Sequence, residues 1–134
     1  MKRFPITQKA LRELENAKKA LQAELYDQAV DTADKAVETI LRGWLEEGAR
    51  ATRETLKERP AIIEELKRMG YAVPVEWHIQ SVRILRNKIR YDNYPVGQQD
   101  AEITIGIVEK FIDEACKIEL KKAVLRLQQQ KRKK

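Results

Sequence analysis

The intervals between apolar residues constrain the fold of this chain more than any other feature of its sequence. Apolar side chains recur every three or four residues over 11–25 and again over 29–45. This interval matches the 3.6-residue turn of an α-helix, so each stripe predicts one amphipathic helix. We expect a first helix over roughly 7–24, capped by Thr7. After a break at Tyr26-Asp27, a second, alanine-rich helix should run to Gly48.

The second half of the chain predicts three more helices. A third helix is expected over about 52–68, with Pro60 as a kink or break inside it, or as the division between two short helices. Gly70 should end it, a fourth helix should run from Pro74 to about 90, and 92–97 reads as a loop. The last helix should begin near Gln98. The pattern as a whole predicts an all-α fold, an antiparallel helical bundle of four to five helices.

The start of the last helix carries an unusual alternation of Ile103, Ile105 and Ile107. Alternation is typical of a short strand, but the helical periodicity that follows favours an apolar collar around a buried helix start. The 134 residues suit a single domain over 1–134, with 36% charged and 6% aromatic residues favouring helices with solvated faces. We find no internal repeat or flexible linker.

The net charge of +6 permits a phosphate-bearing partner without requiring one. Five cations crowd into the C-terminal segment, which we expect to be a basic helix end or tail over 121–134; they are Arg126, Lys131, Arg132, Lys133 and Lys134. Without them the rest of the chain is nearly neutral. Such a segment is more typical of a solvated helix end than of a nucleic-acid-binding arm.

Single cysteine and histidine residues narrow the possible chemistry. Cys116 has no partner for an internal disulfide, and its apolar neighbours predict a core thiol in a reducing compartment. His78 lies on an apolar line of the fourth helix, where we expect a partly buried structural group, and it is too far from Cys116 in sequence for a metal site.

Glycine-rich nucleotide motifs are absent, so no cofactor is expected. With neither a leader nor a run of about 18 apolar residues, we expect a cytoplasmic protein without a membrane partner.

Three arginines share one face of the predicted fourth helix, in line with Ile79. Arg83, Arg86 and Arg90 recur at intervals of three and four, where like charges repel. Two interpretations remain open. The arginines form salt bridges to neighbouring helices, or they form an anion site, since guanidinium groups bind carboxylate and phosphate with the same geometry.

The residues that follow Arg86 resemble a family signature. Residues 86–94 read Arg-Asn-Lys-Ile-Arg-Tyr-Asp-Asn-Tyr. This string is similar to the motif of the HEPN family, an arginine followed by a polar residue, four to six positions, then a histidine, often with a tyrosine two residues later. The order of helices over about 8–120 resembles the family as well. In HEPN ribonucleases, the resemblance implies, the arginine and histidine of two subunits meet at a dimer cleft and cleave RNA without metal.

The resemblance implies roles for several residues and shows one departure. Arg86 matches the motif arginine and Asn87 the polar follower, but the histidine position falls on Arg90, Tyr91 or Asp92, depending on the spacing. With five intervening residues Asp92 replaces the histidine and Tyr94 matches the later tyrosine; with four, Tyr91 replaces it. Tyrosine ordinarily titrates near pH ~10 and aspartate near ~4, so neither shares protons near neutrality as histidine does.

Three functions follow from these patterns. The first is a non-catalytic, homodimeric HEPN-like domain that binds RNA, a nucleotide or an acidic partner through its arginine-rich face. Candidate binding residues are Arg83, Arg86, Asn87, Arg90, Tyr91, Asp92 and Tyr94. The resemblance also implies a toxin–antitoxin-like pairing with a minimal nucleotidyltransferase. The second is a metal-independent RNA endonuclease with Tyr91 or Asp92 in a weakened acid/base role, and the third is a helical interaction scaffold.

Overall fold

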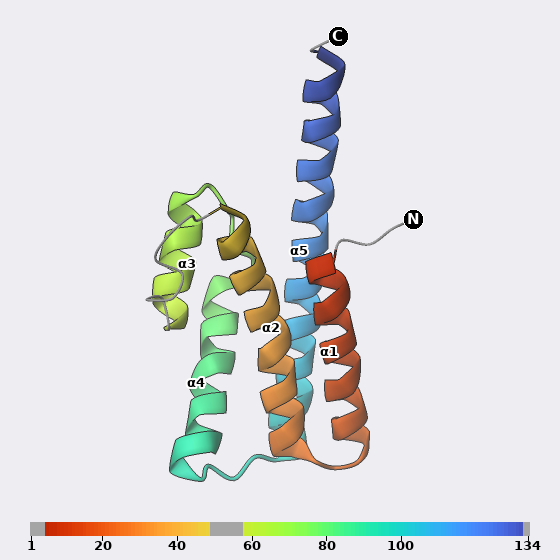
Figure 1. Ribbon diagram of the computed structural model, residues 1–134. Coiled ribbons are helices and arrows are strands. Elements are labelled where there is room, and N and C mark those ends of the chain that lie inside the picture. The colour runs from red at the N-terminus through yellow and green to blue at the C-terminus, as the bar shows by residue number, and fades with distance from the viewer. Residues whose placement is uncertain (1–4, 49–57, 133–134) are drawn as a thin grey trace.

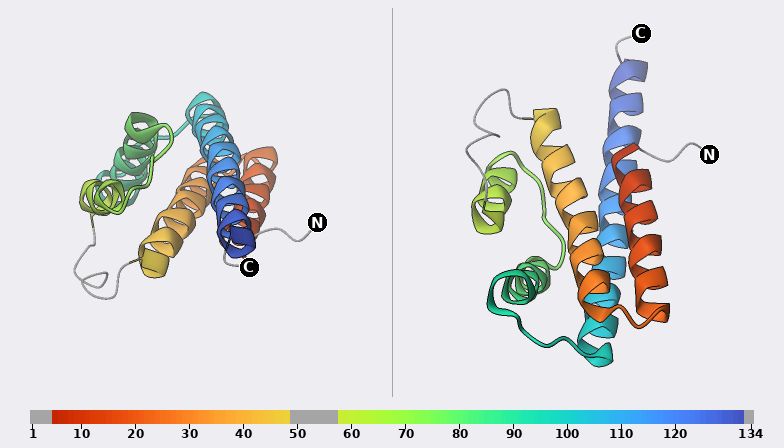
Figure 2. Two further views of the ribbon diagram at one scale, coloured as in Figure 1. Left: turned by 90° about the horizontal axis from the view of Figure 1, so that it is seen from above. Right: turned by 60° about the horizontal axis from the view of Figure 1, so that its bottom comes forward.

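The computed structural model describes residues 5–48 and 58–132 and confirms the all-α bundle. In these residues five helices follow one another without a strand (Figure 1), namely α1 (Pro5–Gln22), α2 (Tyr26–Gly48), α3 (Arg59–Arg68), α4 (Glu76–Asp92) and α5 (Gln98–Arg132). Helices α1, α2 and α5 lie side by side, and α4 lies against the other side of α2 (Figures 1 and 2). Because α2 contacts all four of the other helices, it is the centre of the fold.

The core combines small residues between helices with a few large ones. Ala10 and Ala17 of α1 and Ala29 and Ala33 of α2 are fully buried in this core, where small side chains leave room for a close approach of helices. Trp44 of α2 stacks on Tyr71 at a ring distance of 4.9 Å and packs against Phe111 of α5. These contacts join α2, the α3–α4 connector and α5 in one apolar core.

The turn between α1 and α2 lies earlier in the chain than predicted. The break expected at Tyr26-Asp27 is wrong, because Tyr26 already begins α2 and residues 23–25 form the turn. Glu24 has a left-handed φ of 61°, and the Leu25 amide donates to the Ala20 carbonyl, as in a Schellman helix end. At the other end of the helix, Thr7 does not cap α1, which begins at Pro5.

Pro60 lies at the start of α3, which begins at Arg59, so the predicted kink is wrong, while the alternative of a break at this point agrees with the structure. It occupies the first turn of α3, where the missing amide proton has no helical partner in any case. Residues 52–57 of the predicted third helix lie outside the described residues. Gly70, with a φ of +96°, ends this region as expected, and α4 begins at Glu76 after Val75 rather than at Pro74.

Helix α5 runs without interruption through the alternating isoleucines to Arg132. Ile105 is buried, but Ile103 is exposed and Ile107 only half-buried, so the expected apolar collar is wrong. Residues two apart point in different directions on a helix, and only one of them can face the core.

The described part of the basic segment, 121–132, is a helix end that projects beyond the other helices (Figure 1). Within the described residues, every helix is too short or too polar to cross a membrane.

Candidate functional site

The arginine line of α4 faces an acidic line of α2. Asp31, Asp34 and Glu38 recur at intervals of three and four, which places their carboxylates on one side of α2. Arg83, Arg86 and Arg90 each approach at least one of them within 3.5 Å. The salt-bridge interpretation of these arginines is therefore correct for the described structure.

Arg59, at the start of α3, joins the same network and was not among the predicted site residues. Its guanidinium group donates to Asp34 Oδ1 at 2.6 Å, to Glu38 Oε1 at 3.0 Å and to the carbonyl oxygen of Ile79 at 3.0 Å. Its side chain is only 1% exposed. Arg59 thus ties α3 to α2 and to α4 through one buried cation.

Arg83 lies beside Arg59 and shares its two acidic partners. Its Nη2 atom is 2.9 Å from Asp34 Oδ2 and 2.9 Å from Glu38 Oε1. Burial and the neighbouring charge of Arg59 lower the pKa of Arg83. Burial pushes the pKa of Glu38 upward, but the positive charges of Arg59 and Arg83 outweigh it, so the pKa of Glu38 is lowered.

The other end of the arginine line is open at Arg90, which is 45% exposed, whereas Arg83 and Arg86 are 19% and 16% exposed. Arg90 Nη2 lies 2.8 Å from Asp31 Oδ1, whereas Arg86 Nε lies 3.5 Å from the same atom. Arg86 also donates from Nη1 to the Asn87 Oδ1 atom at 2.8 Å. Arg42 also pairs with Glu38, so five arginines in all meet the three carboxylates of α2.

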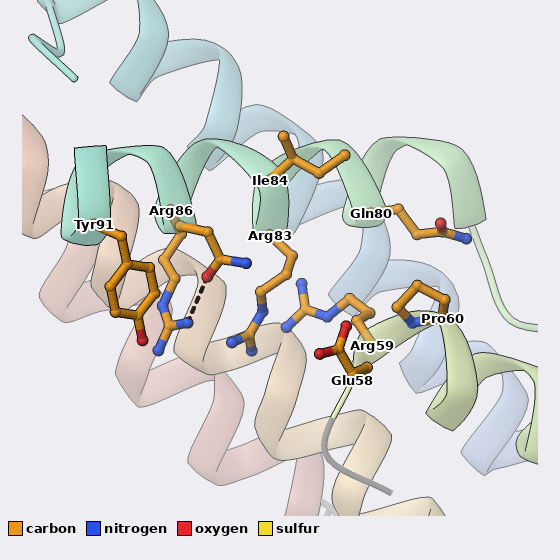
Figure 3. Close-up of a pocket in the computed structure, with 9 residues that line it drawn as sticks. Glu58, Arg59, Pro60, Gln80, Arg83, Ile84, Arg86 and Tyr91 are labelled. Carbon is orange, nitrogen blue, oxygen red and sulfur yellow. Dashed lines mark hydrogen bonds between the residues drawn. The ribbon is translucent and has the colours of Figure 1, made fainter. Parts of the chain in front are cut away.

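Three of the arginines line a cavity of about 370 Å³ between α3 and α4 (Figure 3). Its wall is made of charged and polar side chains with two apolar ones; the lining residues are Glu58, Arg59, Pro60, Gln80, Arg83, Ile84, Arg86, Asn87 and Tyr91. We call it the arginine cavity. The Nε atoms of Arg59 and Arg83 are buried and have no hydrogen-bond partner. The terminal nitrogens of both side chains bind the carboxylates of Asp34 and Glu38.

Four of the seven predicted site residues line this cavity, namely Arg83, Arg86, Asn87 and Tyr91. Arg90 lines an adjoining cavity of about 290 Å³ on the acidic side, which it shares with Arg83 and Arg86. Tyr94 lines a separate depression together with Tyr26, between the α1–α2 turn and the α4–α5 loop. Asp92 is exposed and lines none of these three cavities.

The three candidates for the histidine position differ in their placement. Tyr91 lines the arginine cavity with Arg86, whereas Arg90 and Asp92 do not. His78 does not line it either and is exposed on α4, so the expected partly buried position is wrong. The arrangement supplies guanidinium groups for an anion and the carboxamides of Gln80 and Asn87 for hydrogen bonds. No imidazole lies among the residues that line the arginine cavity.

Potential metal ligands are scattered over the part of the chain that is described. No three His, Cys, Asp or Glu side chains of residues 5–48 and 58–132 lie together as a metal site. Cys116 is half-buried and packs against the core.

Comparison with known proteins identifies the family. No curated protein and no solved structure shows a significant match to this chain. The family model for the HEPN domain, however, matches residues 6–119, a range that includes the α2 acids, Arg59 and the whole of α4. Because this match covers most of the sequence, the chain belongs to the HEPN domain family.

Proposed function

We propose that this HEPN domain binds RNA through a phosphate in the arginine cavity and does not cleave it. The observation that carries the proposal is that three guanidinium-bearing residues, Arg59, Arg83 and Arg86, line one cavity. Guanidinium groups bind phosphate oxygens through charge-assisted hydrogen bonds, which are stronger than hydrogen bonds between neutral groups. A nucleotide offers the same phosphate chemistry and is the smaller alternative ligand.

The proposal of binding without cleavage rests on the missing imidazole. The only histidine, His78, does not line the arginine cavity, and Tyr91 occupies the position beside Arg86. A positioned general acid or base contributes about 10²–10⁴-fold to a rate when its pKa lies near the working pH. A tyrosine is a poor replacement on this ground, because its ordinary pKa is about 10.

A homodimer formed through α4 is part of the proposal. Trp77, Ile84 and Tyr91 are spaced by seven residues on the outer side of α4, and they are 79%, 57% and 74% exposed. Such a line of large exposed side chains supports a helix-to-helix contact. In a two-fold dimer the same line would meet itself, which would bring two arginine cavities close together.

RNA binding at different salt concentrations tests the proposal. The fluorescence anisotropy of a labelled single-stranded RNA should give a log Kd that rises linearly with log salt, because each neutralised phosphate releases counterions. An Arg86→Gln variant should bind more weakly and lower the slope by about 0.7 for each phosphate that it no longer neutralises. Lys110→Gln, at an exposed position of α5 outside the cavity, is the matched control and should leave the slope unchanged.

The basic end of α5 is the competing source of any salt dependence. A variant with glutamine at Lys131 and Arg132 separates the two sites, since it leaves the arginine cavity intact. The proposal is contradicted if this variant loses the slope while Arg86→Gln retains it. Light scattering of a Trp77→Ala variant checks the dimer, which should become a monomer.

A scaffold is the second candidate, and the ion pairs of Arg83 and Arg90 with α2 favour it. A scaffold of this kind should bind no RNA.

Residual endonuclease activity is tested by incubating the protein with RNA in EDTA. Cleavage that Arg86→Ala abolishes would contradict binding without cleavage. Pairing with a minimal nucleotidyltransferase, or with another acidic protein, stays a prediction that co-purification can test.

A further inference from the structure

The C-terminal end of α5 carries an exposed apolar stripe that the RNA-binding proposal does not use. We call residues 120–132 the α5 arm; it continues α5 beyond the ends of the neighbouring helices (Figures 1 and 2). Leu120, Val124 and Leu127 follow one another at intervals of four and three, and all three are exposed. This spacing places them in one line along the helix.

The base of the arm is held to the bundle on a different side. Trp44 donates from its indole nitrogen to Glu119 Oε1, and the Lys122 ammonium lies 3.4 Å from the centre of the Tyr71 ring. At about 100° per residue, the line of Leu120, Val124 and Leu127 lies roughly a third of a turn from Glu119 and nearly half a turn from Lys122. The stripe therefore points away from the core while the helix beneath it is anchored.

The charge of the α5 arm restricts what can cover the stripe. The arm contains five cations and no acidic residue; the cations are Lys121, Lys122, Arg126, Lys131 and Arg132. If the α5 arm of a second copy covered the stripe, the five positive charges of one arm would face the five of the other, and the two arms would repel each other. An acidic surface would instead match the charge along the whole length of the arm.

The width of the stripe separates a protein helix from the other anionic surfaces. Leu125 points to the opposite side of the arm, so the apolar surface along Leu120 and Leu127 is a narrow seam rather than the broad face that an interfacial membrane helix presents. RNA would be attracted by the cations but offers the leucines little to pack against. A narrow apolar seam flanked by charge is the surface that helix-to-helix packing uses.

We propose that the α5 arm docks an acidic amphipathic helix of a partner protein along Leu120, Val124 and Leu127. The partner helix would supply apolar residues at intervals of three and four to cover the seam. Its glutamates or aspartates would lie beside the lysines and arginines of the arm. This surface is separate from the arginine cavity, so the two ligands do not compete for the same residues.

Two leucines of the arm provide a matched pair for the experiment. Leu127 on the seam is 59% exposed and Leu125 on the opposite side is 50% exposed, so either can become serine without opening the core. The probe is a labelled synthetic helical peptide with leucines on one seam and glutamates beside them, and its binding to the full chain is followed by fluorescence anisotropy. Leu127→Ser should weaken binding about tenfold, whereas Leu125→Ser should change it less than about twofold.

Further probes identify the other possible occupants. A peptide of the same composition with its leucines scrambled should bind at least about tenfold more weakly than the seam peptide. Equal binding of the two peptides, or equal losses in the two leucine variants, would overturn the proposal. Phosphatidylglycerol vesicles or labelled RNA whose binding depends on Leu127 but not Leu125, or a dimer that Leu127→Ser dissociates, would also overturn it. Arg86→Gln should bind the peptide normally, which keeps this test independent of the arginine cavity.

Discussion

The network between α2 and its arginines has a buried end and an open end, and the same chemical groups have different consequences at each. Arg59, 1% exposed, meets Asp34 in the interior. Arg90, 45% exposed, meets Asp31 at the surface at a comparable distance, 2.8 Å against 2.6 Å. Similar geometry at the two ends means that solvent exposure, rather than distance, decides what each ion pair contributes.

The buried end fixes the fold, and the open end leaves charge available. Removing one partner of a buried ion pair leaves an uncompensated charge in the interior, which costs about 3–5 kcal/mol. An exposed pair contributes only about 0.2–1 kcal/mol, because water and salt screen it. We therefore expect the buried arginine Arg59 to position the walls of the cavity and the more open Arg86 to vary with its ligand.

The largest effect is expected from Asp34→Asn. This change should lower the free energy of unfolding by about 3–5 kcal/mol, because it leaves Arg59 and Arg83 with one carboxylate fewer in a buried setting. Asp31→Asn is the matched control on the same helix and should cost less than about 1 kcal/mol. Urea unfolding followed by circular dichroism measures both, and equal losses would contradict the division into two ends.

A medium effect with a defined pH dependence is expected at Glu38. Its pKa is lowered in the folded state, so its stabilising contribution is present above the ordinary glutamate pKa and is lost as the pH falls through the folded value. Glu38→Gln should lower the free energy of unfolding by about 1.5–3 kcal/mol at neutral pH. The difference between variant and wild type should shrink below pH ~4.5. A difference that stays constant with pH would show that charge is not its cause.

The smallest effect on stability is expected at the open end. Arg90→Ala should change the free energy of unfolding by about 0.2–1 kcal/mol, and added salt should reduce the difference further. A double-mutant cycle with Asp31→Ala isolates the pair. A coupling as large as that of Asp34 would mean that the open end is structural as well.

The sequence predicted the helices well because apolar periodicity directly reflects burial. Their ends were harder to place. Pro60 reads as a kink when an apolar pattern is assumed on both sides of it, but a proline is equally suited to the first turn of a helix. The α1–α2 turn was misplaced because Glu24 takes a left-handed conformation that usually marks a glycine or an asparagine.

The site was only partly predictable, since its pairs are distant in sequence. Arg83 and Arg86 could be grouped by helical spacing, but Arg59 reaches Asp34 across 25 residues, and no local pattern shows such a pair. One signal was available. Asp31, Asp34 and Glu38 form a regular acidic line on an alanine-rich helix, and a line of acids on a helix that is otherwise buried requires cations from elsewhere in the chain.

The buried contact of Arg59 with Asp34 also restricts how this sequence can evolve. Selection should remove a substitution of either residue alone, because the remaining charge would be buried without its partner. Replacing both with apolar residues of similar volume is often neutral in proteins, yet it requires two changes at once. Homologous sequences should therefore keep the two residues together or lack them together, and intermediates should be rare.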